Sequence, residues 1–189
     1  MKTHTASIRR LTVIALFAAL MTVLSQISVP LGPIPFSCGI LGALLCGLML
    51  RPRDAVLALL VYILLGAAGL PVFAGFRAGL SAVTGMTGGY LVGYLLIAGL
   101  TATAVQLVSG QNKRCAAAVI LCAETAGVLA CYAFGTAWFM FLSGNSLAAA
   151  LSACVLPFLP GDALKILLAY MLAAVLKKRL SQAGLRLSF

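Results

Sequence analysis

The stretch LTVIALFAALMTVLSQISV, residues 11–29, decides the fold, because it carries no charged side chain over a length that can span a membrane as a helix. Lys2, Arg9 and Arg10 precede it, and Pro30 follows it. No cleavage site of the A-x-A type occurs before Pro30, so we expect this helix to be retained and not removed as a signal peptide. The run therefore predicts a first membrane helix.

Similar apolar runs recur along the rest of the chain. The segments between them are rich in proline, glycine or charge: VPLGPIP at 29–35, RPRD at 51–54, GQNKR at 110–114 and SGNS at 143–146. We predict six transmembrane helices in a single domain that covers residues 1–189, the second and third of them short and joined by a tight link. The expected helices are at about 11–29, 37–50, 55–70, 81–108, 115–142 and 147–176.

The composition agrees with an all-α integral membrane protein. Apolar residues make up 63% of the chain and charged residues 8%, whereas soluble domains have roughly 45–50% and 25%. The net charge is +10, but the cations cluster between apolar runs and do not line a polar face, which argues against nucleic-acid binding. The six cysteines include no C-x-x-C pair and His4 is the single histidine, so we expect no metal site.

The loop cations predict an orientation in the cell membrane. If successive loops alternate between the two sides, eleven cations fall on one side and only Arg77 falls on the other. The eleven are Lys2, Arg9, Arg10, Arg51, Arg53, Lys113, Arg114, Lys177, Lys178, Arg179 and Arg186. Because cytoplasmic loops are enriched in Lys and Arg, we expect both termini in the cytoplasm and the loops near 30–36, 71–86 and 143–146 outside.

Three charged residues lie within the predicted membrane depth, where each costs about 2.5–3.5 kcal/mol at a helix centre. Asp162 and Lys165 belong to PFLPGDALK at 157–165, which interrupts the last apolar run and is expected to restart a helix at Asp162. Being three residues apart, they share a helix face. Two interpretations stay open: Asp162 caps the helix and pairs with Lys165, or the broken helix builds a polar site for a small solute.

Glu124 is the third buried charge, about 13 Å into the fifth predicted helix from its cytoplasmic end. We expect it to approach Lys165 near the middle of the membrane. It then forms a structural ion pair, stays protonated, or contacts a ligand directly.

The external loop at 66–94 is dense in glycine and carries both Arg77 and Tyr90. Such a segment suits a lid over an anionic, partly apolar ligand, although a flexible connection is the simpler interpretation. Trp138, with Tyr132 and Phe134, could wall the same cavity or serve only in packing. Small residues four apart, as in Ala15 and Ala19 or in Gly85, Gly89 and Gly93, indicate close helix packing.

Four motifs together resemble the BioY family, the biotin-binding S component of energy-coupling-factor (ECF) transporters. They are ALFAALMTVLSQISVPLGPIPFS at 15–37, GAAGLPVFAGFRAG at 66–79, TGGYLVGY at 87–94 and VLPFLPGDALK at 155–165, within a resemblance that covers about 11–179. The resemblance implies an S-component-like bundle that takes biotin from outside and delivers it with a transmembrane coupling subunit and two cytoplasmic ATPases. Ala15 and Ala19 match the A-x-x-x-A surface that the family uses for the coupling subunit.

The family places its polar ligand contacts largely on the last helix, so Asp162 and Lys165 are expected to bind biotin. Asp162 can accept from the ureido N–H groups, Lys165 or Arg77 can pair with an oxygen, and Tyr90 or Trp138 can pack on the ring. Glu124 stays a further candidate contact. No cofactor is expected besides the ligand biotin.

Other functions are weighed against this one. An S component for a different vitamin would keep the fold and the partners, and a self-contained secondary carrier would need a coupling ion. An enzyme is not expected, because the chain contains no G-x-x-x-x-G-K-[ST] phosphate loop, no H-E-x-x-H and no G-x-S-x-G.

Overall fold

The computed structural model describes residues 2–30 and 34–183, with side chains described from residue 8. Helices dominate this part of the chain, and one two-stranded antiparallel hairpin pairs Ser28 with Ser37 and Val29 with Phe36. The elements in order are α1 (Lys2–Gln26), β1 (Ser28–Val29), β2 (Phe36–Ser37), α2 (Gly39–Met49), α3 (Pro52–Ala67), η1 (Ala74–Phe76), α4 (Leu80–Thr84), α5 (Gly88–Leu107), α6 (Lys113–Ser143), α7 (Leu147–Cys154) and α8 (Leu159–Gln182).

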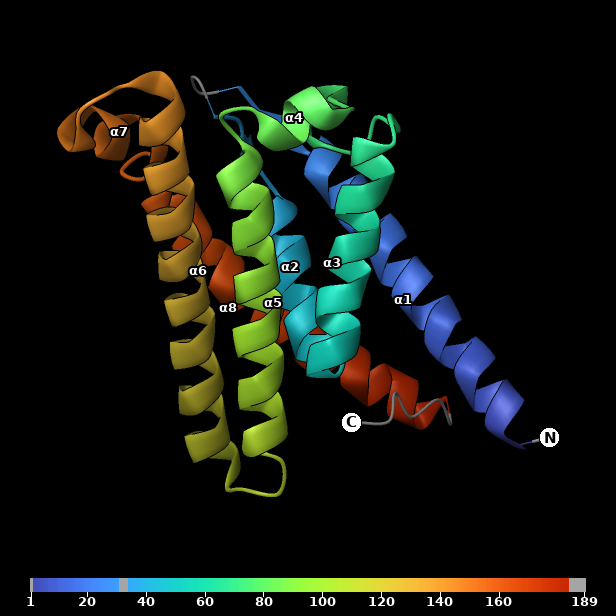
Figure 1. Ribbon diagram of the computed structural model, residues 1–189. Helices are drawn as coiled ribbons and strands as arrows, with labels where there is room; N and C mark the ends of the chain where they lie inside the picture. Colours follow the sequence, from blue (N-terminus) through green and yellow to red (C-terminus); the bar gives the residue numbers. More distant parts are fainter. Residues whose placement is uncertain (1, 31–33, 184–189) are drawn as a thin grey trace.

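The helices form a bundle with two distinct ends (Figure 1). One end, which we name the hairpin end, carries β1 and β2, η1, α4 and α7. The other, which we name the terminal end, carries the start of α1, the turn between α5 and α6, and the last turns of α8. Loops predicted to lie on the same side of the membrane therefore lie at the same end of the molecule.

Within the part of the chain that the structure describes, four helices are long and apolar enough to cross a membrane: α1 from Ile8, α5, α6 and α8. This makes the chain a multi-pass membrane protein. The helices α2 and α3 are short, as predicted: their 11 and 16 residues extend only about 16 and 24 Å, against the ~30 Å of the hydrocarbon core. The hairpin precedes α2 and lengthens that segment toward the hairpin end.

Two of the predicted runs are divided in the structure. The run expected at 81–108 contains α4 and α5, and the run expected at 147–176 contains α7 and α8. A Cβ at Gly88 would collide with the carbonyl oxygen of Val83, so the turn between α4 and α5 needs glycine. The helix α8 begins at Leu159, not at Asp162, because Pro160 fits the first turn of a helix, where its missing N–H leaves no bond unmade.

The predicted packing role of the small residues is confirmed between α5 and α6, which pack together extensively. A Cβ at Gly89 would collide with Trp138, and one at Gly93 would come within 2.9 Å of the Cα of Cys131. Across the same interface, a Cβ at Gly127 would lie 3.0 Å from the Cα of Ile97. The two backbones approach this closely only because the side chains are missing.

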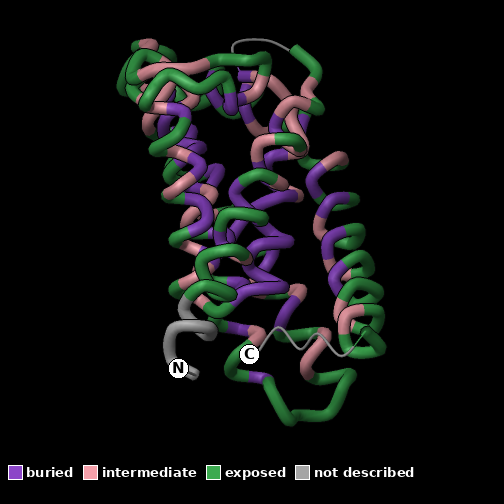
Figure 2. The backbone as a smooth tube through the Cα atoms, turned by 90° about the vertical axis from the view of Figure 1, so that its right-hand side faces the viewer, coloured by how far each residue is buried: buried purple, intermediate pink, exposed green. Residues whose placement is uncertain are grey.

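Burial separates the inward and outward faces of the long helices α1, α5, α6 and α8, whereas α2 is buried almost all round (Figure 2). On α1 an exposed stripe includes Leu11, Leu16 and Val23, and the small residues Ala15 and Ala19 are exposed on it as well. Such a face suits lipid or another membrane helix. Among the described residues, Ser25, Thr101, Glu124, Thr136, Asp162 and Lys165 are the polar and charged ones that are buried.

Candidate ligand-binding site

An ion pair lies at the start of α8. Lys165 Nζ is 2.7 Å from Asp162 Oδ1, and the two residues are 6% and 2% exposed. They share a helix face at i and i+3, as their spacing predicts. Two charges removed from water in this way are stable only when they are paired and fully hydrogen-bonded. The remaining contacts of the two side chains therefore decide whether the ion pair is stable.

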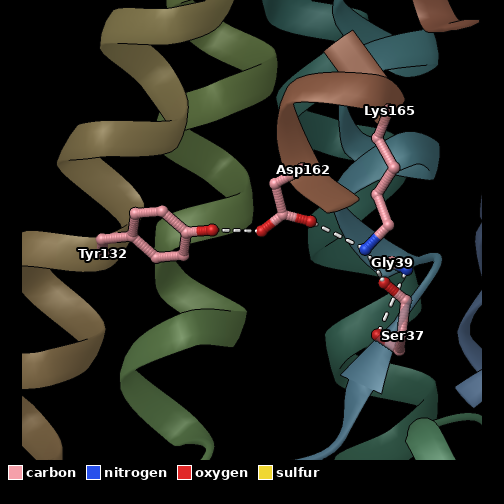
Figure 3. A network of polar contacts seen from close by, with 5 residues as sticks. All are labelled: Ser37, Gly39, Tyr132, Asp162 and Lys165. Carbon is pink, nitrogen blue, oxygen red and sulfur yellow. Dashed lines mark hydrogen bonds and ion pairs between the residues drawn. The ribbon is translucent and has the colours of Figure 1, made fainter. Parts of the chain in front are cut away.

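Two other segments complete the hydrogen bonds of the pair (Figure 3). The hydroxyl of Tyr132, on α6, donates to Asp162 Oδ2. Lys165 Nζ donates to the backbone oxygen of Ser37 on β2 at 2.7 Å, and the Ser37 hydroxyl accepts from the backbone N–H of Gly39 at 3.2 Å. The pair therefore joins α8 to α6 and to the hairpin, and both carboxylate oxygens have a donor.

Aromatic rings cover one side of the pair. Lys165 Nζ lies 3.5 Å from the centre of the Phe36 ring, a cation–π distance. Phe158, which precedes α8, packs on the same ring at 5.5 Å between centroids. A Cβ at Gly161 would collide with the Phe36 ring, so the glycine of the P-G-D sequence makes room for this contact.

Tyrosines form the opposite wall. Tyr62 donates its hydroxyl to Ser25 Oγ at 2.9 Å and meets Phe73 edge-on, with centroids 5.4 Å apart. The hydroxyls of Tyr90 and Thr136 lie 3.3 Å apart. The hydroxyls of Tyr62 and Tyr90 thus each have a partner, and the ring faces line an apolar space.

The space between these walls is partly covered by the segment 71–77, which runs from α3 toward α4. The side-chain amide of Gln26, at the end of α1, donates to the backbone oxygens of Pro71 and Phe73 at 3.2 and 3.1 Å and accepts from the N–H of Phe76 at 3.1 Å. Phe76 has φ 58°, a left-handed conformation that non-glycine residues seldom adopt. We refer to these three hydrogen bonds as the Gln26 clasp.

These elements enclose a cavity at the hairpin end, open toward the 71–77 segment. Of the six residues predicted to bind ligand, it brings together four: Asp162, Lys165, Arg77 and Tyr90. Its other lining residues are Ser25, Ile34, Pro35, Phe36, Ser37, Ile40, Tyr62, Phe73, Ala74, Thr87, Leu91, Tyr94, Tyr132 and Phe158. Arg77 is exposed at the rim, whereas Asp162 and Lys165 lie buried.

Trp138 and Glu124 do not line this cavity. The indole of Trp138 donates to the Gly85 oxygen at 3.0 Å and so holds the turn between α4 and α5. Glu124 is fully buried on α6, and its carboxylate oxygens have no hydrogen-bond partner among the described residues. It therefore forms no ion pair with Lys165, whose acidic partner is Asp162.

Sequence reasoning missed several of the cavity residues. The Ser37 oxygen is a backbone group of a two-residue strand, and no pattern of side chains predicts such a strand. Ser25 and Tyr62 could have been found, because both are polar residues near the hairpin ends of otherwise apolar helices. Tyr132 was considered only as an aromatic wall, yet its hydroxyl binds the buried carboxylate.

The sequence and the structure were compared with those of known proteins. The family model described as "BioY family" matches residues 1–182. The chain is 36% identical to the "Probable biotin transporter BioY" of Pyrococcus horikoshii, covering 87% of this chain and 94% of that protein. It is also 36% identical to the "Biotin transporter BioY" of Thermotoga maritima, covering 90% and 96%.

Among solved structures, the fold is similar to that of the S-component for biotin from an ECF-type ABC transporter. The TM-score is 0.80 at 26% sequence identity, and the match covers 92% of this chain and 93% of the other. The similarity extends over nearly the whole length of both chains, so it concerns the complete bundle.

Proposed function

The chain belongs to the BioY family, and from this premise we propose that it captures biotin at the external face of the membrane as the S component of an ECF transporter. The observation that carries the proposal is the buried Asp162–Lys165 pair that lines the cavity. It suits binding, because it offers an acceptor and a donor side by side. The chain is a transport subunit and not an enzyme.

The ureido group of biotin suits the buried end of the cavity. It is neutral, with two N–H donors and one carbonyl acceptor, and Asp162 and Lys165 together are neutral too. Each carboxylate oxygen of Asp162 can accept more than one hydrogen bond, and Lys165 has three N–H donors of which two are used on Asp162 and Ser37. Both residues therefore keep capacity for a ligand without breaking their own contacts.

The carboxylate of biotin suits the mouth. Placed at the buried end it would face the negative charge of Asp162, whereas Arg77 at the rim offers a guanidinium in contact with water. Between the two ends, the rings of Tyr62, Tyr90 and Phe73 give an apolar passage for the ring system and the aliphatic chain. We therefore assign the ureido group to Asp162 and Lys165, and the carboxylate to Arg77.

The same proposal covers topology and partners. We propose that the bundle crosses the cell membrane six times with both termini in the cytoplasm, which the positions of the loop cations support. The hairpin end then faces outward. Ala15 and Ala19, exposed on α1, are proposed to receive the transmembrane coupling subunit, which joins this chain to two cytoplasmic ATPases.

Binding to the purified subunit tests the ligand. Titration with biotin, with riboflavin and with thiamine should show saturable binding of biotin alone, and a tighter response to another vitamin would refute the assignment. Uptake into liposomes separates an S component from a self-contained carrier. Accumulation of biotin should need the coupling subunit, both ATPases and ATP, and accumulation by this chain alone on an ion gradient would overturn the partner assignment.

A further inference from the structure

A second cavity lies at the terminal end, far from the biotin cavity, where α1, the link between α2 and α3, and the end of α5 meet. Four arginines and one aspartate line it, a net of three positive charges, and we name it the basic cleft. The arginines are Arg9, Arg10, Arg51 and Arg53. Nothing in biotin capture uses this concentration of guanidinium groups.

One of the arginines is committed to holding the cleft together. Arg10 Nη2 and Nε lie 2.5 and 2.7 Å from Asp54 Oδ1, which joins α1 to the first turn of α3. This contact fixes the two walls of the cleft relative to each other. It also neutralises the acidic residue that lines the cleft, so the field there is set by the other arginines.

The start of α3 adds to the positive field. Arg51 is extended at the N-cap position and makes no side-chain cap, and Pro52 follows at the first helical position. The backbone N–H groups of a first helical turn have no partner within the helix, and the helix dipole places partial positive charge there. A helix start flanked by guanidinium groups is a favourable site for phosphate oxygens.

The floor of the cleft is apolar, and this feature favours a lipid over free phosphate as the ligand. Val13 and Ile14 on α1, with Met49 and Leu50 at the end of α2, line it below the arginines. Ile8 and Leu11, on the same stretch of α1, do not line the cleft, and each is 63% exposed. A phosphate that carries acyl chains can use both parts of this surface, whereas inorganic phosphate can use only the cations.

We propose that the basic cleft binds the phosphate head group of an anionic phospholipid, whose acyl chains lie along α1. The head group contacts the guanidinium groups of Arg51 and Arg53 and the first turn of α3. The lipid thus occupies the membrane face opposite to the biotin cavity, between the two helices that the Arg10–Asp54 contact joins.

The test compares two double substitutions that remove the same charge. R51Q/R53Q removes two cations of the cleft. K113Q/R114Q removes two cations at the start of α6, which lies at the same end and is capped by the Asn112 side chain, and neither residue lines the cleft. Biotin affinity and the emission of Trp138, at the hairpin end, report whether each variant is folded.

Binding of short-chain phosphatidylglycerol to the purified subunit is measured by native mass spectrometry, beside phosphatidylcholine of equal chain length and inorganic phosphate. The parent and K113Q/R114Q should bind phosphatidylglycerol alike, and R51Q/R53Q about 10- to 30-fold more weakly, since each surface cation contributes roughly a threefold to fivefold factor. Equal weakening in both variants, or equal binding of phosphatidylcholine, would overturn the proposal. Displacement of the lipid by an equal concentration of inorganic phosphate would overturn the assignment to lipid.

Discussion

Asp162 and Lys165 are each other's main compensation for leaving water, because the charge of either one alone would be unpaired at membrane depth. Tyr132 and the Ser37 oxygen complete their hydrogen bonds, so the pair is fixed in place before any ligand arrives. A preformed acceptor and donor reduce the cost of ordering side chains on binding. In the proposed binding mode, recognition and stability depend on the same two residues.

Substitutions in the pair should therefore weaken both properties. D162N gives the ligand one acceptor fewer and a competing donor, and K165M removes the cation, so each should raise the dissociation constant of biotin roughly 10- to 150-fold. Each should also lower thermal stability, because the remaining charge loses its partner. Affinity is measured per folded molecule, by calorimetry on the fraction that binds. Unchanged affinity in both variants would mean that the pair is purely structural.

The contribution of Arg77 to binding can be distinguished from that of Asp162 and Lys165 by a change in the ligand. R77Q should weaken the binding of biotin about 10-fold or more, since it removes a charge-assisted hydrogen bond to the carboxylate. The methyl ester of biotin lacks that charge, so R77Q should affect its binding far less. D162N serves as the control, because it should weaken acid and ester alike. An equal effect of R77Q on the two ligands would place the carboxylate elsewhere.

At the scale of elements, the helix α1 has two faces with different tasks. Its inward face packs on α2 and α3, and its outward stripe carries Ala15 and Ala19 among larger apolar residues. A small residue on an outward face leaves a shallow groove in which another helix can approach closely. The outward stripe contributes no residue to the lining of the cavity, to which α1 contributes Ser25.

A bulky residue in that groove should impair assembly and leave capture intact. A19L should reduce co-purification with the coupling subunit and ATP-driven uptake several-fold, with biotin affinity of the isolated subunit within about twofold of the parent. The matched control is A126L, an equal enlargement at an exposed alanine of α6, on the far side of the bundle from α1. If A126L impaired assembly as much as A19L, the contact would not be specific to α1.

The sequence predicted the long elements well, because apolar runs bounded by charge or turn residues define α1, α5 and α6 over several helical turns. The sequence did not predict the features that depend on local geometry. The division between α7 and α8, the start of α8 at Leu159 and the two-residue strands follow from single turns and from packing between distant segments. For the same reason Asp162 and Lys165 could be paired from their spacing, while Ser37 and Ser25 could not be placed beside them.

The whole molecule has opposite chemistry at its two ends. The hairpin end holds the biotin cavity and one loop cation, Arg77, and the terminal end holds the basic cleft and the remaining loop cations of the described residues. The topology proposed above places these cations on the cytoplasmic side. On that topology the cavity opens to the outside.

Cysteine labelling should verify this orientation. In a background without the partly or fully exposed Cys38, Cys115 and Cys122, a cysteine at position 112 should react with a membrane-impermeant maleimide only from the cytoplasmic side, and one at position 145 only from outside. The native Cys46, Cys131 and Cys154 can remain, because they are 0–1% exposed. The reverse labelling, or labelling of both positions from one side, would contradict the topology.

The Gln26 clasp connects α1 to the segment at the mouth of the cavity. One amide side chain on α1 makes three hydrogen bonds to the segment 71–77, so a displacement of either is resisted by the other. Thermodynamic reciprocity then applies: if occupancy of the cavity changes the affinity of α1 for a neighbouring helix by some factor, that helix changes the affinity for biotin by the same factor. In the proposed complex, a coupling subunit that prefers the loaded S component would also raise its affinity for biotin, so ATP would have to supply the free energy of release.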